Sequence, residues 1–335
     1  MAVKVGINGF GRIGRNVFRA AHDRGADIEW VAINDIMDPE TMAHLLKYDS
    51  ILGRFDGEIE AGDASIRVNG TEIPVLSEPE PAKLPWGDMG VEVVMEASGK
   101  FTDEGEADQH LGAGAKKVIV SAPSKGDVLT VVPGVNDGDY DPDQHNVISC
   151  ASCTTNCLGP VAMVLHEKFG IEHGLMTTVH AYTADQQLQD GPHKDLRRAR
   201  AAGVNLVPTT TGAAAAIGLV IPALQGKLNG YAIRAPVNDG SLLDLTVTLN
   251  KDVESEDEIN EAFAERADKN GLEGILRYTD EPLVSSDIVK SPYSSVFDSG
   301  MTLLLDGNMV KVVAWYDNEY GYSHRVVDMV EKVLP

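Results

Sequence analysis

In the first half of the chain, short apolar runs alternate with amphipathic segments. Apolar runs of this length are typical of buried strands, while residues 15–24 place Val17, Phe18, Ala20 and Ala21 at the spacing of one helical face. The predicted strands are residues 3–7, 28–33, 91–95 and 117–120, and the predicted helices are residues 15–24 and 104–113. Residues 61–75 add two predicted strands around an Asn69-Gly70 turn. Strands that alternate with helices predict a parallel sheet.

The second half of the chain has a different pattern, with longer strands and fewer helices. The predicted strands are residues 175–179, 232–234, 242–249, 301–305 and 309–315, the last two forming a hairpin around Asp306-Gly307-Asn308. The predicted helices are residues 158–168, a helix beginning near Thr211, residues 256–269 and residues 323–333. A strand-rich mixture of this kind is typical of a separate α+β domain. We expect the last helix to return to the first domain.

Three glycines mark the turn between the first strand and the first helix. Gly9, Gly11 and Gly14 form the pattern G-x-G-x-x-G inside a strand–helix–strand unit. Such glycines allow a tight turn and bring the backbone close to a pyrophosphate, which lies at the helix N-terminus. Asp35 follows the second strand, where a carboxylate accepts hydrogen bonds from ribose hydroxyls and repels a 2′-phosphate. The sequence therefore predicts a bound NAD rather than NADP.

Two serines follow later strands of the same predicted sheet. Ser98 comes after residues 91–95, and Ser121 comes after residues 117–120. Ligands of open parallel sheets lie beyond the carboxyl ends of the strands, so both serines are candidates for the cofactor edge; the alternative is that they only begin loops. The predicted fold class is α/β: a Rossmann-type doubly wound parallel sheet plus an α+β catalytic domain with a mixed sheet. The predicted NAD-binding domain is residues 1–152, completed by the C-terminal helix 318–335, and the predicted catalytic domain is residues 153–317.

The three cysteines of the chain, Cys150, Cys153 and Cys157, lie between a predicted strand and the helix at 158–168. A helix start carries free N–H groups and a positive dipole end, which favour a thiolate, so Cys153 is the candidate nucleophile. The alternative is that these are small buried packing residues. Such clustering does not form a disulfide framework and favours a reducing, cytoplasmic setting. Since no second ligand pair is present, no metal site is predicted.

Residues that follow the cysteines supply the other groups that a cysteine nucleophile needs. His180 lies just after the strand at 175–179, where it is a candidate proton acceptor near neutral pH. Arg198 lies in a polar segment with three arginines, and Arg234 ends a predicted strand; both are candidate anion contacts. Thr211 and Gly212 offer a hydroxyl and backbone N–H groups at a helix start.

The charge of the chain is strongly one-sided. There are 51 acidic against 28 basic residues, giving a formal net charge of −23 and a pI near 4.6. Such a surface repels nucleic acid and anionic membranes, and its self-repulsion favours a protein adapted to high salt; an acidic protein of ordinary salt habitats is the alternative. The chain begins with a strand instead of a signal segment and has no apolar run near eighteen residues, so neither secretion nor membrane insertion is expected.

Several longer motifs resemble one enzyme family along essentially the whole chain. They are INGFGRIGR, ASCTTNC, TTVHAYTADQ, PHKDLRRARAA, PTTTGAA and WYDNEYGYS, and all are similar to phosphorylating glyceraldehyde-3-phosphate dehydrogenases. The resemblance implies oxidative phosphorylation of glyceraldehyde 3-phosphate to 1,3-bisphosphoglycerate with NAD reduction, in glycolysis or gluconeogenesis. It also implies a homotetramer.

The resemblance assigns roles to individual residues. Cys153 would be the nucleophile and His180 the base. The positions that recognise the two phosphates would be Ser152, Thr154, Thr183, Arg198, Thr211, Gly212 and Arg234. The cofactor positions would include Arg12, Ile13, Asp35, Ser121 and Asn318, with Asn318 holding the nicotinamide carboxamide.

The chain departs from the family pattern at three places, all near the predicted cofactor. Pro79-Glu80-Pro81 stand where Arg-Asp-Pro is frequent, Ala215 stands where lysine is usual, and Gly191-Pro192 stand where Leu-Pro is common. These departures leave the predicted chemistry intact and bear only on NAD over NADP. The alternative enzymes are an erythrose-4-phosphate dehydrogenase, which hydrolyses its thioester, and a semialdehyde dehydrogenase without a second phosphate pocket. The alternative outside catalysis is an NAD-sensing regulator.

Overall fold

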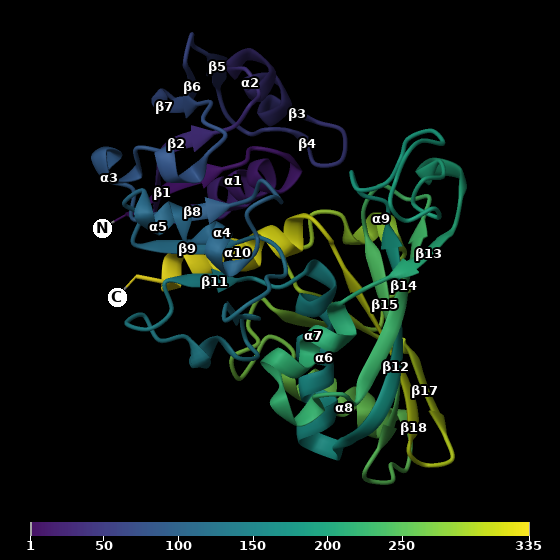
Figure 1. The fold of residues 1–335 in the computed structure, drawn as a ribbon. Helices are drawn as coiled ribbons and strands as arrows, with labels where there is room; N and C mark the ends of the chain where they lie inside the picture. Colours follow the sequence, from purple (N-terminus) through teal and green to yellow (C-terminus); the bar gives the residue numbers. More distant parts are fainter. Residues whose placement is uncertain (1, 335) are drawn as a thin grey trace. The chain divides into compact units, whose positions relative to one another are not determined.

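The computed structural model describes residues 2–334, which divide into two compact units. The first unit comprises the chain up to Val131, Gly138–Ala151, and the chain from Ser323 onward. The second unit comprises Val132–Asp137 and Ser152–Tyr322. Each unit has its own sheet, and Figure 1 labels most of the helices and strands of both.

The first unit is built on a nine-stranded sheet with the order β10-β11-β9-β8-β1-β2-β7-β6-β5. From β10 to β7 all neighbouring strands are parallel, and β6 and β5 add an antiparallel edge. The strands are β1 (Val3–Asn8), β2 (Ile28–Asn34), β5 (Ile59–Ala61), β6 (Ser65–Val68), β7 (Thr71–Leu76), β8 (Val93–Glu96), β9 (Lys117–Val120), β10 (Leu129–Thr130) and β11 (Val147–Ser149). Strands β8 and β9 are buried over their full length and β1 and β2 toward their carboxyl ends, as expected for a parallel sheet covered on both faces.

The helices of the first unit include the crossover helix α1 (Arg12–Arg24), which ends at Gly25 in the left-handed conformation that glycine tolerates. The others are α2 (Pro39–Lys47), α3 (Trp86–Met89), α4 (Glu104–Ala107), α5 (Gln109–Gly112) and most of α10 (Tyr320–Lys332). Arg24 of α1 pairs with Asp328 at 2.5 Å and with Glu331 at 2.6 Å. The C-terminal helix therefore packs within the first unit. A small separate ribbon, β3 (Tyr48–Asp49) with β4 (Gly53–Arg54), follows α2.

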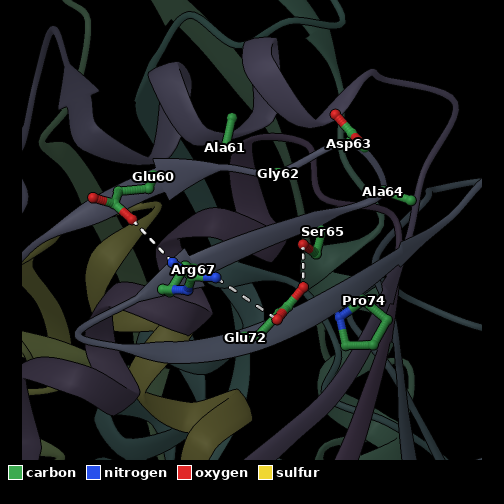
Figure 2. Close-up of a pocket in the computed structure, with 9 residues that line it drawn as sticks. All are labelled: Glu60, Ala61, Gly62, Asp63, Ala64, Ser65, Arg67, Glu72 and Pro74. Atoms are coloured by element: carbon green, nitrogen blue, oxygen red, sulfur yellow. Dashed lines mark hydrogen bonds and ion pairs between the residues drawn. The ribbon is translucent and has the colours of Figure 1, made fainter.

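The antiparallel edge of this sheet carries a shallow hollow over β5, β6 and β7 (Figure 2). Arg67 is paired there with Glu60 at 3.4 Å and with Glu72 at 3.8 Å, and Ser65 donates to Glu72. Asp63 adds a third carboxylate to the lining. None of the predicted site residues lines this hollow, so it is separate from the chemistry that the sequence predicts.

The second unit is built on a seven-stranded mixed sheet with the order β13-β14-β12-β15-β18-β17-β16. The strands are β12 (Ile171–Ala181), β13 (Val207–Thr210), β14 (Leu228–Ala235), β15 (Ser241–Leu249), β16 (Leu276–Thr279), β17 (Ser295–Leu305) and β18 (Met309–Tyr316). Its helices are α6 (Cys153–Phe169), α7 (Ala213–Val220), α8 (Glu256–Arg266) and the short α9 (Ser285–Ile288). Helices α6, α7 and α8 lie together against one face of the sheet (Figure 1).

The two faces of this second sheet differ sharply in their surroundings. On β12, Met176, Thr178 and His180 point to the face that the helices cover and are buried, while Leu175 and Val179 alternate with them and are exposed. This alternation follows from the two-residue period of a strand. Because the register aligns β12 with β14 and β15, His180 faces the helix layer beside Arg234, its partner residue on β14.

The fold class predicted from the sequence is confirmed. One local prediction is wrong. The helix expected over 104–113 is interrupted at Asp108, where Leu111 N bonds back to the Asp108 oxygen at 3.0 Å, and forms the two short helices α4 and α5. The two strands expected within 61–75 are confirmed as β6 and β7, and their Asn69-Gly70 turn has the positive φ angles, 48° and 84°, that a tight hairpin needs. Strand β5, which ends at Ala61, was not predicted.

Candidate functional site

The glycine turn of the first unit is shaped by close backbone packing at two of its three glycines. A Cβ at Gly9, where φ is +97°, would lie 2.4 Å from the Ser98 nitrogen, and a Cβ at Gly14 would lie 2.2 Å from the Gly9 oxygen. Gly11 differs, since a Cβ there would meet nothing within 4 Å. Protein packing therefore does not explain the missing side chain at Gly11. Open space before the first turn of α1 fits a pyrophosphate that approaches the backbone.

Asp35 lies directly after β2 and accepts hydrogen bonds from two backbone N–H groups. Phe10 N donates to one carboxylate oxygen at 2.6 Å and Met37 N donates to the other at 2.9 Å. The first of these bonds joins Asp35 to the glycine turn. Each carboxylate oxygen has a second lone pair, so the side chain keeps the capacity to accept from ribose hydroxyls.

The ends of the central strands are joined by a buried polar network that the sequence reasoning missed. Glu96, only 1% exposed, accepts from Asn8 at 2.5 Å and from the Ser98 N–H and hydroxyl at 2.7 and 2.5 Å. The Trp86 indole donates to His110 Nδ1 at 3.0 Å, so the His110 proton sits on Nε2, 3.0 Å from Glu96. Polar residues at the last position of apolar strands, such as Asn8 and Glu96, are the signal that could have found this network.

The remaining cofactor candidates of the first unit have defined partners. Ser121 donates its hydroxyl to the Glu96 carbonyl oxygen at 3.0 Å, so Ser98 and Ser121 are both joined to Glu96. Arg12, in the first turn of α1, forms a salt bridge with Asp49, and Ile13 beside it is partly exposed. Asn318 lies in the second unit. The other predicted cofactor residues all lie near the carboxyl ends of β1, β2, β8 and β9 in the first unit.

The cysteine stretch forms the beginning of α6 in the second unit. Cys153 is the first residue of the helix, and Ser152 is its N-cap, whose hydroxyl accepts from Thr155 N at 3.1 Å. Cys153 Sγ lies 3.4 Å from His180 Nε2. Cys157 lies one turn further on and is fully buried, and its carbonyl oxygen accepts from Ser295 at 2.7 Å. Of these two, only Cys153 faces a base.

The contacts of the other ring nitrogen of His180 bear on which tautomer the imidazole adopts. His180 Nδ1 lies 2.7 Å from the Ala181 carbonyl oxygen, which only accepts, and 2.9 Å from Arg234 Nη1, which only donates. Arg234 Nη1 has the Ala181 oxygen as a second acceptor at 3.2 Å, so both N–H groups are satisfied when Nδ1 carries the proton. In that tautomer Nε2 has a lone pair directed at Cys153. The arrangement presents His180 as a proton acceptor for the thiol.

The pKa values of this pair are set mainly by burial. Burial raises the pKa of the Cys153 thiol to about 11, although the Arg234 charge and hydrogen bonds with Thr154 offset part of this rise. Burial also lowers the pKa of His180 to about 3, and the Arg234 charge adds to the effect. The expectation that the helix start lowers the thiol pKa is therefore wrong for this structure, because desolvation is the larger influence. Both pKa shifts favour the neutral forms of the pair, a thiol and an imidazole.

Arg198 and Arg234 supply positive charge around this pair. The charge of Arg198 helps to lower the pKa of Arg234 and of His180, which puts both guanidinium groups in one electrostatic neighbourhood. Arg198 donates to Thr209 at 2.9 Å and forms salt bridges with Asp185 and Asp195. The Nε of Arg234 is buried and has no hydrogen-bond partner. A buried cationic donor without an acceptor fits a site that receives an anion.

The other predicted phosphate residues do not share one set of strand ends, because β13 runs antiparallel to β14 and its last residue, Thr210, pairs with Tyr231 instead of Arg234. Thr183 follows the carboxyl end of β12, while Thr211 and Gly212 lie between β13 and α7, where Thr211 accepts from Ala213 N at 3.2 Å. A Cβ at Gly212 would meet nothing within 4 Å. The Thr154 hydroxyl is buried and bonded to Tyr316 OH at 2.9 Å, so in this structure only the Thr154 backbone is left for a ligand.

Asn318 lies directly after β18 and Asp317, in the second unit. Its side chain is 4% exposed, its Oδ1 accepts from the Ser241 hydroxyl at 2.6 Å, and its Nδ2 is buried without a partner. An unpaired buried donor fits the carboxamide of a nicotinamide ring. Among residues 2–334, no group of three or more His, Cys, Asp or Glu side chains is arranged to hold a metal ion.

A Rossmann-type sheet with an open glycine turn, in a chain that also has a cysteine–histidine pair beside arginines, is typical of an NAD-dependent dehydrogenase. Comparison with known families identifies the group within this class. The family models for the NAD binding domain and the C-terminal domain of glyceraldehyde 3-phosphate dehydrogenase match residues 3–104 and 152–318. The chain therefore belongs to the glyceraldehyde 3-phosphate dehydrogenase family.

Individual relatives are similar over nearly the full length of the chain. Glyceraldehyde-3-phosphate dehydrogenase 1 of Streptomyces avermitilis is 60% identical over 329 residues, which cover 98% of each chain. The glyceraldehyde-3-phosphate dehydrogenase of Geobacillus stearothermophilus is 58% identical and covers 98% of this chain and 97% of its own. That of Mycolicibacterium smegmatis is also 58% identical, with 99% of each chain covered. The family resemblance predicted from the motifs is thus confirmed.

Proposed function

We propose that this protein oxidises and phosphorylates D-glyceraldehyde 3-phosphate to 1,3-bisphosphoglycerate, with NAD as the electron acceptor, in glycolysis or gluconeogenesis. The observation that carries the proposal is the distance of 3.4 Å between Cys153 Sγ and His180 Nε2, with Arg234 beside the imidazole. Membership of the family and the names of the relatives support the same substrate.

In the proposed reaction, His180 moves protons while Cys153 holds the substrate. His180 Nε2 takes the thiol proton as Sγ attacks the aldehyde carbon, and the Cys153 backbone N–H donates to the developing oxyanion. The proton returns to that oxygen and gives a thiohemiacetal. His180 removes it again as the hydride leaves carbon, and a thioester remains on Cys153. Bound NAD supplies the hydride acceptor, and inorganic phosphate then cleaves the thioester.

Two anions take part, the phosphate of the substrate and the attacking phosphate. We assign their recognition to a group of cationic, hydroxyl and backbone donors: Ser152, Thr154, Thr183, Arg198, Thr211, Gly212 and Arg234. The unpaired Nε of Arg234 supports this assignment, as does the open space at Gly212. Basic residues are scarce in a chain of net charge −23. Two arginines in one neighbourhood therefore indicate an anion site more strongly here than they would in a basic protein.

The cofactor is assigned to two sets of residues. The pyrophosphate would be held at the start of α1 by Gly9, Gly11, Arg12, Ile13 and Gly14. Asp35 would bind the adenosine ribose. Ser98 and Ser121 would contact the cofactor at the carboxyl ends of the strands that precede them. Asn318 would hold the nicotinamide carboxamide through its unpaired Nδ2. We propose residues 1–152 with 318–335 as the NAD-binding domain and residues 153–317 as the catalytic domain. The division by internal contacts differs, since it assigns Ser152 and residues 318–322 to the second unit.

The rate of NADH formation with and without inorganic phosphate tests the proposed reaction. With glyceraldehyde 3-phosphate and NAD, absorbance of NADH should rise continuously when phosphate is present and should stop after about one equivalent per site without it. A rate that is independent of phosphate would contradict the proposal and favour the thioester hydrolysis of an erythrose-4-phosphate dehydrogenase. If the protein binds NAD but forms no NADH, the result would favour the alternative of an NAD-sensing regulator without catalytic activity.

We further propose a homotetramer, supported by an uncovered apolar sheet face. On the face opposite the helices, the register places six large exposed apolar residues: Leu175, Val179, Tyr231, Leu303, Leu305 and Met309. The salt bridge between Lys311 and Asp244, at 2.7 Å, lies on the same face between the residues of β12 and β14 and those of β17 and β18. Exposed apolar side chains in such number on one sheet face mark an interaction site. A second copy of the same face is the occupant that the family resemblance implies.

We also propose that the protein is adapted to high salt. Exposed carboxylates such as those of Glu256 and Asp257 in the first turn of α8 contribute to the net charge of −23. Mutual repulsion of such groups destabilises the folded state unless salt screens it. The thermal unfolding midpoint should therefore rise steadily with KCl concentration into the molar range. A midpoint that falls or stays level would remove this proposal and leave an acidic protein of ordinary salt habitats.

A cytoplasmic location is proposed from the chemistry of the cysteines. Cys150, Cys153 and Cys157 are all free thiols, and the proposed nucleophile works only in reduced form. In residues 2–334, no helix combines the length and apolar character that crossing a membrane requires.

A further inference from the structure

The side chain of Asn318 is held at one end and unpaired at the other. Its Oδ1 accepts from Ser241 at 2.6 Å, whereas its Nδ2 is buried and has no partner. With only 4% of the residue exposed, water does not readily satisfy that donor. The unpaired N–H groups therefore need an acceptor that arrives with a ligand.

The hydrogen-bond directions around Ser241 determine which end of the amide faces it. Ala181 N donates to Ser241 Oγ at 3.0 Å, and a backbone N–H has no other role than donor. The single Ser241 hydrogen is then free for Asn318 Oδ1. If the amide were reversed, Asn318 Nδ2 and Ala181 N would both donate to Ser241 Oγ, and the hydroxyl hydrogen would need another acceptor. Since Ser241 is 0% exposed, solvent does not supply one.

The backbone on either side of Asn318 leaves the side chain little other freedom. Asp317 accepts from Glu319 N at 2.8 Å and Tyr320 N at 2.6 Å through one oxygen, and from Lys290 N at 2.8 Å through the other. The terminal torsion of an asparagine is broad and nearly two-fold, so a half-turn of the amide is the main remaining motion. Ser241 is the contact that selects between the two half-turns.

The same hydroxyl also touches the strand that carries the proposed base. Ala181, whose N–H binds Ser241, is the residue whose carbonyl oxygen lies 2.7 Å from His180 Nδ1. One serine at the start of β15 therefore contacts both Ala181, the residue whose carbonyl oxygen lies beside His180, and the side chain of Asn318. The contacts run across the sheet from β12 to the end of β18.

We propose that Ser241 is a positioning residue that locks the Asn318 amide with its donor outward, so that the site recognises the carbonyl oxygen of the cofactor's pyridine substituent. This inference rests on the proposed function and deepens it. The chemical class it selects is a dinucleotide whose pyridinium ring carries a hydrogen-bond acceptor at position 3. The amino group of the natural carboxamide is not read by Asn318.

Cofactor analogues with opposite hydrogen-bonding groups test the proposal by equilibrium binding. Calorimetry on the cofactor-free protein gives the dissociation constants of NAD and of two analogues. The 3-acetylpyridine analogue has a substituent that only accepts hydrogen bonds. The 3-aminopyridine analogue has no carbonyl group. The wild type should bind NAD and the acetyl analogue alike. It should bind the amino analogue weaker by roughly three- to tenfold, the usual range for one hydrogen bond.

Two variants separate positioning from general structural effects. In Ser241→Ala the amide is free to turn, so the preference for the acetyl over the amino analogue should shrink toward unity while NAD still binds. Ser241→Thr keeps the hydroxyl and should restore the preference. If Ser241→Ala does not fold, Asn318→Asp, which cannot donate, should lose the preference through weaker binding of the acetyl analogue.

The outcomes that overturn this inference differ from those that overturn the proposed function. A wild type that prefers the amino analogue, or a Ser241→Ala variant that keeps the full preference, shows that Ser241 does not set the amide. If Ser241→Ala does not fold and Asn318→Asp keeps the preference, the inference also fails. In each of these cases the wild type would still form NADH with phosphate. Loss of that activity in the wild type would instead count against the proposed function.

Discussion

Cys153→Ser is expected to lower turnover by on the order of 10⁴-fold or more, because a serine hydroxyl is a far weaker nucleophile and its ester is not the intermediate that phosphate cleaves here. The structure presents one thiol to a base, Cys153 at 3.4 Å from His180 Nε2. The measurement is NADH formation with glyceraldehyde 3-phosphate and phosphate. NAD affinity should stay unchanged, since the variant alters no residue assigned to the cofactor.

Cys157→Ala is the matched control for that variant. Cys157 is fully buried one helical turn from Cys153, and burial strongly raises the pKa of its thiol. Its removal should lower the thermal midpoint by creating a small cavity while leaving kcat near the wild-type value. Substantial turnover by Cys153→Ser would contradict the assignment of Cys153 as the nucleophile. A Cys157→Ala variant that is stable but inactive would contradict it as well.

His180→Asn is expected to lower kcat by roughly 10²- to 10⁴-fold, the usual contribution of a positioned general base. Its KM for NAD should change little, because the replaced ring contacts Cys153 and Arg234 and not the assigned cofactor residues. Retained turnover in this variant would show that another group accepts the proton. Steady-state kinetics with both substrates varied provide the separate constants.

The pH profile of the wild type gives a second view of His180. Because burial lowers the pKa of His180 to about 3, from an ordinary value of 6.5, the imidazole stays neutral and basic throughout the neutral range. The same shift makes folding less favourable as pH falls from 6.5 toward 3, since only the unfolded chain binds a proton there. The value of kcat/KM should consequently show no step near pH 6.5.

The sequence predicted the first unit well because its strands are consecutive and its motif is local. Gly9, Gly11 and Gly14 lie within one turn, and Asp35 follows the next strand along the chain, so their proximity needs no knowledge of tertiary structure. The Glu96 network was missed because it depends on strand order. Residues Asn8 and Glu96 are adjacent only because β1 pairs with β8.

The second unit shows the same limit more strongly. The roles of Cys153 and His180 were expected, but the contact of His180 with Arg234 arises because β14 lies beside β12 in the mixed sheet. The ordering of β12, β15 and β18 likewise brings Ser241 to Asn318, which no spacing in the sequence indicates. The direction of the Cys153 pKa shift was also missed, since the extent of burial is a property of the whole fold.

Trapping of the acyl group on Cys153 tests the central claim most directly. The protein is mixed with glyceraldehyde 3-phosphate and NAD without phosphate, quenched in acid, and analysed by intact and peptide mass spectrometry. We predict one phosphoglyceroyl group per chain, on the peptide that contains Cys153, which disappears when phosphate is added before the quench. NADH formation with no adduct on Cys153, or with an adduct that phosphate does not release, would contradict the account.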